Sequence, residues 1–346
     1  MTMPRSPLTA RRTERGFSML ELLISMFIGL FLIGAVSAIY IVSKRGYTET
    51  ENVSRANESA RFGLYVLASN FAHLGFFGGA NPATITNGLT AVTGDCTGAV
   101  GASVVDTANH FRVIKATTAS PITCITDAQT NSDVLIIKSV RPVPLSKGVL
   151  DDPTDNAVAV NTPEALNANR VYLWANRIGL EGELFRGNVT PPVTLTAVTD
   201  GVAWEYLAHI YYVRNTAGRE PTLSRKVLRW NATTNQLEVD TEDLVEGAER
   251  LRVLPGVLTG TYLAPQVKYM EAADLVAADW PSVASVQLRL LVRSADIDAG
   301  GVSRNLRYSL VEGTEAGYDY LDPGSADRRY RTVVQETINV RNFAYP

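Results

Sequence analysis

Apolar residues fill one continuous stretch near the start of the chain, from Phe17 to Ser43, in which Glu21 is the only charged residue. As an α-helix, these 27 residues would be about 40 Å long, which exceeds the ~30 Å hydrocarbon core of a bilayer. The stretch therefore predicts a membrane-spanning helix.

The apolar pattern continues beyond the stretch at a helical spacing, but on one face only. From Lys44 to about His73, apolar residues recur every three or four positions: Val53, Ala56, Ala60, Leu64, Leu67 and Phe71. No proline occurs between Pro7 and Pro82. We therefore expect one helix of more than fifty residues from Phe17, with an amphipathic second half that packs on a globular domain. The glycine-rich segment that begins at Gly75 should end the helix.

Beyond Pro82 the pattern changes to short β-like runs separated by Gly, Pro, Asn and Asp. The predicted strands are Phe111–Lys115, Asp133–Val140, Arg170–Trp174, Glu183–Arg186, Leu207–Arg214, Leu223–Trp230, Val283–Arg293 and Tyr330–Val340. Asp243–Leu251 is predicted to be a short helix, and residues 141–169 a long exposed connection between two sheet lobes. The fold class is therefore α+β, with a long helix on a mainly antiparallel β-domain.

Basic residues precede the apolar stretch, at Arg5, Arg11, Arg12 and Arg15, and only Lys44 and Arg45 follow it closely. By the positive-inside rule, the start of the chain stays in the cytoplasm and the long remainder faces the other side. An ordinary secretory signal places its small cleavage-site residue after the apolar stretch. Here Gly16 comes before it.

A carboxylate in a spanning helix costs about 2.5 to 3.5 kcal/mol on insertion scales, so Glu21 needs an explanation. One interpretation is a carboxylate at headgroup depth that is tolerated without a role. The other depends on cleavage after Gly16, which would create an amine at Phe17. A Glu21 carboxylate of a neighbouring subunit could pair with that amine in a low-dielectric helix bundle.

The segment from Arg11 to Glu21 resembles the leader of type IV prepilins and pseudopilins. The resemblance implies that a prepilin peptidase cuts between Gly16 and Phe17, that Phe17 is then N-methylated, and that Glu21 forms the assembly salt bridge. It divides the chain into a leader (1–16), a membrane and assembly helix (17–43), an amphipathic extension (44–75) and a β-rich globular domain (76–346). Many pilins carry a proline in the membrane half of the helix, and this chain does not.

The second half of the chain resembles the PilW family of minor pilins. The similar segments are Tyr211–Arg214, Leu244–Glu249, Ser285–Ser294 and Arg328–Asn342. The resemblance implies a minor pilin that joins other minor pilins in a tip complex and primes pilus assembly.

The partners that this resemblance implies are other minor pilins, the major pilin, a tip adhesin of the PilY type, the prepilin peptidase and the inner-membrane assembly platform. The expected location is the inner membrane, with the C-terminal domain in the periplasm, and the pilus tip after assembly. The alternative family is the minor pseudopilin J of type II secretion, whose chains are usually much shorter. Whether the filament serves adhesion, twitching or DNA uptake is left open.

The composition fits a folded exterior domain, with 46% apolar and 19% charged residues. The formal charge is −3, and loss of residues 1–16 would make it about −6, so nothing favours binding to nucleic acid. Cys96 and Cys124 are the only cysteines. In an oxidising periplasm they are expected to form a disulfide, and the alternative is two buried thiols.

Candidate catalytic residues are few. The histidines, His73, His110 and His209, are scattered and form no HExxH pattern, and no Walker or Rossmann glycine pattern occurs. Asp151–Asp155 could bind calcium but lacks the glycine and terminal glutamate of an EF-hand, which favours a solvated loop. The sequence predicts no enzyme, cofactor or metal. The competing class is a membrane-tethered periplasmic enzyme or ligand-binding module.

Overall fold

A computed structural model gives the fold. It describes residues 16–145, 166–176, 180–188, 201–261, 264–297, 307–310, 319–321, 327 and 329–340. The chain divides between Glu51 and Asn52 into two compact units. Helix α1 (Met19–Phe71) supplies the described part of the first unit and the first element of the second. The predicted long helix is therefore confirmed, and it ends just before Gly75, whose φ is 75°.

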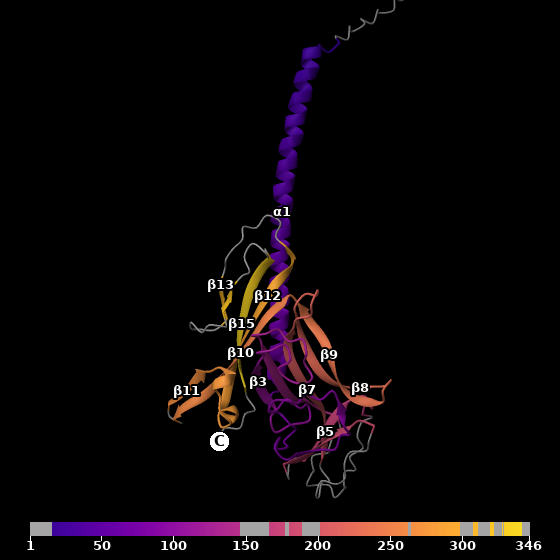
Figure 1. Ribbon diagram of the computed structural model, residues 1–346, viewed down its shortest axis with the longest axis vertical. Coiled ribbons are helices and arrows are strands. Elements are labelled where there is room, and N and C mark those ends of the chain that lie inside the picture. The colour runs from indigo at the N-terminus through magenta and orange to yellow at the C-terminus, as the bar shows by residue number, and fades with distance from the viewer. Residues whose placement is uncertain are drawn as a thin grey trace, which may run out of the picture. The chain divides into compact units, whose positions relative to one another are not determined.

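The second unit contains two main β-sheets (Figure 1). Among the described residues, the larger sheet has nine strands, and its main path runs β1-β6-β5-β7-β8-β9-β2, with β4 on β7 and β3 on β4. Its strands are β1 (Ile85–Asn87), β2 (Val92–Thr93), β3 (Phe111–Lys115), β4 (Asp133–Pro144), β5 (Val171–Asn176), β6 (Glu181–Arg186), β7 (Val202–Arg214), β8 (Thr222–Asn231) and β9 (Gln236–Glu246). Most pairs are antiparallel, whereas β1 on β6 and β2 on β9 are parallel.

The smaller sheet has the order β11-β10-β12-β15 in the described part of the chain. Its strands are β10 (Ala248–Thr261), β11 (Ala264–Tyr269), β12 (Val283–Ile297) and β15 (Arg329–Asn339). Two 3₁₀ turns, η1 (Ala272–Asp274) and η2 (Trp280–Ser282), precede β12, and β13 (Arg307–Ser309) pairs separately with β14 (Asp319–Leu321). All three pairings in the four-stranded sheet are antiparallel.

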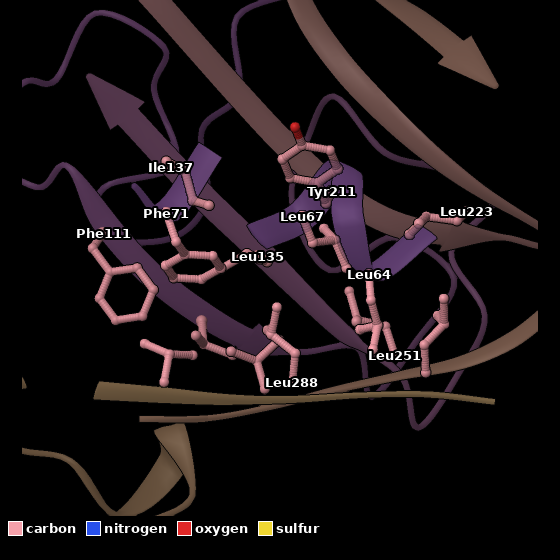
Figure 2. Close-up of a cluster of buried hydrophobic side chains, with 14 of the residues drawn as sticks. Leu64, Leu67, Phe71, Phe111, Leu135, Ile137, Tyr211, Leu223, Leu251 and Leu288 are labelled. Atoms are coloured by element: carbon pink, nitrogen blue, oxygen red, sulfur yellow. The ribbon is translucent and has the colours of Figure 1, made fainter. Parts of the chain in front are cut away.

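The end of α1 packs with both sheets into one core. Its buried positions recur every three or four residues, with Gly63 and Leu64 adjacent, at Asn52, Ala56, Ala60, Gly63, Leu64, Leu67 and Phe71. Figure 2 shows Leu64, Leu67 and Phe71 in one cluster with Leu135 of the larger sheet and Leu288 of the smaller one. The amphipathic face that the sequence predicts is therefore the face that joins the two sheets.

A second core lies on residues of the larger sheet that alternate with the first set, such as Ile136 and Ile210. The loop between β2 and β3 and the segment after β3 cover it with Cys96, Val104, Ile122 and Ile125. Because successive strand residues point to opposite faces, one sheet serves both cores. A third cluster, of Tyr172, Trp174, Phe185 and Ala203, lies on β5, β6 and β7.

The predicted helix over Asp243–Leu251 is wrong. This segment is the end of β9, the single residue Gly247 and the start of β10. Gly247 has a φ of 82°, and a Cβ there would lie 2.5 Å from the Arg293 carbonyl oxygen. A glycine in this backbone conformation turns the chain from one sheet into the other. Leu244, Ala248 and Leu251 have helical spacing, but the reversal at Gly247 decides the structure.

The predicted division into two lobes near 141–169 also differs from the structure. Strands β4 and β5 lie on either side of this segment in the sequence, and both pair with β7 in the larger sheet. The chain instead changes sheets at Gly247. Residues 146–165 of the predicted connection, including Asp151–Asp155, lie outside the described residues.

Candidate assembly site

The predicted processing site lies at the start of the described chain. Gly16, Phe17 and Ser18 precede α1, and Glu21 is in its first turn. A Cβ on Gly16 would have no neighbour within 4 Å. The predicted basic flank at Arg5, Arg11, Arg12 and Arg15 lies outside the described residues.

Glu21 caps its own helix. The Ser18 backbone N–H donates to Glu21 Oε2 over 3.4 Å, and the Ser25 hydroxyl donates to the Glu21 carbonyl over 2.6 Å. A carboxylate at a helix N-terminus is also favoured by the helix dipole. The structure thus places the Glu21 carboxylate against Ser18, the residue that follows Phe17, where cleavage would create a charged amine.

Every large apolar side chain from Phe17 to Val42 is about half or more exposed in the described structure, from 49% at Ile41 to 85% at Met19. An exposed apolar surface of this length is unfavourable in water at about 25 cal/mol per Å². None of the most apolar part of the helix is buried in the described structure. Its length and composition therefore suit it to cross a membrane.

Small residues interrupt this apolar surface. Gly29 and Gly34 have nothing within 4 Å of the position of a Cβ, and Gly34 lies beside Phe31 and Ala35 in a shallow apolar hollow. Such positions let helices approach closely in a bundle.

The outer face of the second half of α1 is also uncovered in the second unit. Phe62 and Tyr65 are 52% and 69% exposed, and they line a shallow hollow together with Ser54, Glu58 and Arg61. This face lies opposite the one that builds the core. It combines two aromatic rings with an acidic and a basic side chain.

The three histidines belong to different places in the fold. His73 follows α1, His110 precedes β3 and contacts Phe77, and His209 lies in β7. His209 is partly buried, and its Nδ1 lies 2.8 Å from Asn70 Oδ1 at the end of α1. Burial and the neighbouring Arg225 charge lower the pKa of His209 to about 3. Burial also lowers the pKa of His110 to about 4, with help from Lys138 and Arg112.

Among the described residues, no group of three or more His, Cys, Asp or Glu is arranged to hold a metal ion. Cys96 and Cys124 form a disulfide that closes a separation of 28 residues in the sequence. His209 links the end of α1 to β7 through its contact with Asn70, and its ring also contacts Tyr211 edge to face.

A cluster of ion pairs at the start of β15 was not predicted from the sequence. Arg331 is fully buried, and its Nε lies 2.8 Å from Glu249 Oε2 while its Nη2 lies 2.6 Å from Asp327 Oδ2. Arg293 also contacts Glu249, and Arg329 contacts Glu220. The signal in the sequence is the alternation of Arg329 and Arg331, which places both side chains on one face of a strand. Asp327 is close to Arg331 in the sequence, but Glu220 and Glu249 come from distant segments and cannot be assigned without the register.

Two family descriptions match parts of this chain. Residues 210–342 match the family described as Type IV Pilus-assembly protein W, and residues 11–37 match the Prokaryotic N-terminal methylation motif. Among solved structures, a type IV-like pilin from Thermus thermophilus is similar at 11% sequence identity and a TM-score of 0.36, over 84% of this chain and 99% of that chain. No curated protein matches the sequence.

Proposed function

We propose that this chain, whose residues 210–342 match the type IV pilus-assembly protein W family, joins other minor pilins in a complex at the filament tip and primes pilus assembly. The observation that carries the proposal is the combination of two matched regions in one chain. The family match runs from β7 to the end of β15, and the methylation motif covers the start of the exposed apolar helix.

The proposal assigns a role to each part of the chain. Residues 1–16 are a leader that the prepilin peptidase removes, and Phe17 is then methylated. Residues 17–43 anchor the protein in the inner membrane and later enter the filament, residues 44–75 extend the helix, and residues 76–346 form a periplasmic domain. The further partners are the major pilin, the assembly platform and a tip adhesin of the PilY type.

Glu21 supplies the proposed contact between subunits. Its carboxylate is exposed and already accepts a hydrogen bond from the Ser18 N–H of its own chain. A methylated amine at Phe17 of a neighbouring pilin would be a stronger partner in a low-dielectric bundle, because both groups are charged. The exposed Phe62 and Tyr65 face is then available to pack against another subunit.

The proposed role is structural rather than catalytic. The histidines lie in separate elements, and partial burial contributes to the lowered pKa values of His209 and His110. These are properties of groups that pack in a core. Incubation of the purified chain with hydrolase substrates would reveal activity if the competing enzyme hypothesis were correct.

Co-purification tests the proposal directly. The full chain with a C-terminal tag, solubilised from membranes in mild detergent, should recover other minor pilins in defined ratios. An unrelated single-span membrane protein with the same tag is the control. Recovery of no pilin would contradict the proposal, and recovery of the pseudopilins of a secretion system would favour the pseudopilin J alternative.

A further inference from the structure

A buried lysine organises the loop between β2 and β3. Lys138 of β4 is 0% exposed, and its Nζ donates to the carbonyl oxygens of Gly101, Asp106 and Asn109 over 2.8, 2.6 and 3.2 Å. An ammonium group has three N–H donors, and here each has a backbone acceptor. All three acceptors belong to one loop of turns, whose residues 94–110 we call the lysine loop.

The acceptors around Lys138 resemble the ligand set of a bound cation. Backbone carbonyl oxygens are the groups that hard cations take from turns in proteins. Burial lowers the pKa of Lys138 to about 8, while the charges of Asp106 and Asp95 oppose this shift. Isolation of a charge in a protein interior is costly unless the charge is fully hydrogen-bonded, and this one is.

The lysine loop has two further anchors. Asp95 Oδ1 accepts from the backbone N–H groups of Cys96 and Val104, each over 2.8 Å, and Asp95 Oδ2 accepts from the Ser103 hydroxyl over 2.6 Å. The Tyr206 hydroxyl of β7 donates to the Val104 carbonyl over 2.7 Å. The loop is therefore tied to itself and to the larger sheet by bonds that do not involve sulfur.

Hydrogen bonds also hold together the two segments that carry the cysteines. The Thr97 N–H donates to Thr123 Oγ1 over 2.7 Å, and the Thr123 N–H donates to the Thr97 carbonyl over 3.1 Å. Thr97 and Thr123 are the direct sequence neighbours of Cys96 and Cys124. These bonds between Thr97 and Thr123 bring the two cysteines together. They involve no sulfur atom, so they can form while Cys96 and Cys124 are still thiols.

We propose that Lys138 acts as the internal cation of the lysine loop, and that the loop formed around it holds Cys96 opposite Cys124 before they are oxidised. Lys138 is then a positioning residue for the disulfide, and oxidation locks a loop that has already folded. With glutathione disulfide as oxidant, the two protein thiols form one S–S bond, the S–S bond of the oxidant breaks, and two glutathione thiols are released. Because the loop folds before oxidation, the two thiols have a high effective concentration towards each other.

The first test measures that effective concentration in the full chain, in detergent and in glutathione redox buffers. Lys138→Met keeps the apolar part of the side chain but removes the ammonium, and it should lower the effective concentration at least about tenfold. Lys268→Met, in the exposed strand β11, makes the same chemical change away from the loop and should stay within about twofold. Circular dichroism of both redox forms ensures that only folded protein is compared. A Lys138→Met value within twofold of the wild type would overturn the proposal.

Chemical rescue separates the ammonium from the volume that it fills. Lys138→Ala lacks the atoms that propylammonium would supply, so added propylammonium should restore the effective concentration saturably. The uncharged analogue 1-propanol fills the same space without the charge and should not do so. Equal rescue by both compounds, or rescue by neither, would show that the cation is not what builds the loop.

The second test removes the disulfide instead. In the Cys96→Ser, Cys124→Ser chain, the amide hydrogen of Val104 should retain its exchange protection within about fivefold, because Asp95 and Lys138 still hold the loop. Loss of that protection would mean that the disulfide creates the loop. The order of events proposed here would then be reversed.

Discussion

At the scale of single residues, the proposed function depends most on Glu21. The structure indicates how much removal of its side chain would destabilise the helix. Its side chain is exposed and caps the helix through the Ser18 N–H. A lost cap costs about 0.5 to 2 kcal/mol, and α1 continues for fifty residues beyond Glu21 to Phe71. A variant at Glu21 should therefore keep the helix, so a defect in assembly would report on the carboxylate itself.

Glu21→Ala should leave leader cleavage largely intact and strongly reduce assembly, because the amine of a neighbouring Phe17 would lose its charged partner. Glu21→Gln is the matched control, since its amide oxygen can still cap the helix but carries no charge. We expect both variants to be processed and both to co-purify poorly with other pilins. Wild-type recovery of pilins by Glu21→Gln would mean that the charge is not needed.

Gly16 is not required by the fold in the described chain, because a Cβ there would meet nothing within 4 Å. Gly16→Val should therefore leave the folded protein unchanged but block the peptidase, whose site must accept this position. The intact mass of the membrane form should then include residues 1–16, whereas the wild type should begin at Phe17. A full-length leader on the wild type in cells that contain the peptidase would contradict the prepilin interpretation.

The partly buried His209 gives a pH-dependent prediction. The pKa of His209 is about 3 in the folded chain and 6.5 in the unfolded chain. Between pH 3 and pH 6.5, the unfolded chain therefore binds a proton at this residue and the folded chain does not. The contribution of His209 to the free energy of unfolding is therefore fully present above pH 6.5. It falls as the pH is lowered towards 3, by up to about 1.4 kcal/mol per pH unit. His110 acts in the same direction down to about pH 4, and Asp133 acts oppositely because its pKa is raised to about 6.

Comparison of the wild type with His209→Gln isolates the contribution of this histidine. The groups that face it are Asn70 of α1, Tyr211 of the same strand and Arg225 of β8. Between pH 7.5 and 5.0 the wild type should lose about 2 kcal/mol more free energy of unfolding than the variant. Denaturant titrations at the two pH values measure the difference, and equal losses would show that His209 is not buried in its neutral form.

At the scale of elements, local patterns predicted the helix and eight strands because their periods are visible in the sequence. The start of β7 was missed, since Trp204 and Glu205 interrupt the apolar run that defines Leu207–Arg214. The acidic strand β9 was missed because its charges are balanced by cross-strand partners such as Arg225, which contacts Glu242. Pairing across the sheets depends on register, so neither the ion pairs around Arg331 nor the contacts of Lys138 could be read from spacing.

The helix supplies a test of packing between elements. Leu67 is fully buried between the two sheets, and Leu67→Ala should cost about 2 to 5 kcal/mol because it leaves a cavity in the shared core. Tyr65→Ala lies two residues away on the exposed face and should cost little. Thermal unfolding of the full chain in detergent, followed by near-UV circular dichroism, compares the two. Similar losses for both variants would contradict the orientation of the helix.

At the scale of the whole molecule, the chain joins an exposed apolar helix to a domain with closed cores. The signal for the first part lies in a contiguous motif, from Gly16 to Glu21, and the sequence alone was enough to propose its role. The contacts that hold the second part, such as Arg252 with Asp133, join residues more than a hundred positions apart. A functional hypothesis is therefore easier to form here than the architecture is to predict, because the residues of the motif are local in sequence and the structural contacts are not.

The domain that follows the helix is the reason to expect a position at the filament end. Residues 76–346 make up most of the chain. Subunits repeated along a tightly packed shaft must share its surface with close neighbours, whereas a subunit at the tip has none above it. There, the Glu21 carboxylate would offer the next pilin a docking point, and the slow nucleation step would be bypassed.

Deletion of the protein should therefore sharply reduce surface pili while the major pilin accumulates normally in the membrane, and expression of the wild-type chain should restore them. In sheared filaments, labelled protein should be far less abundant than the major pilin and should lie at ends in electron micrographs. Labelling that is uniform along the shaft would instead indicate a bulk subunit. Normal piliation in the deletion strain would remove the priming role, because filaments would then nucleate without this protein.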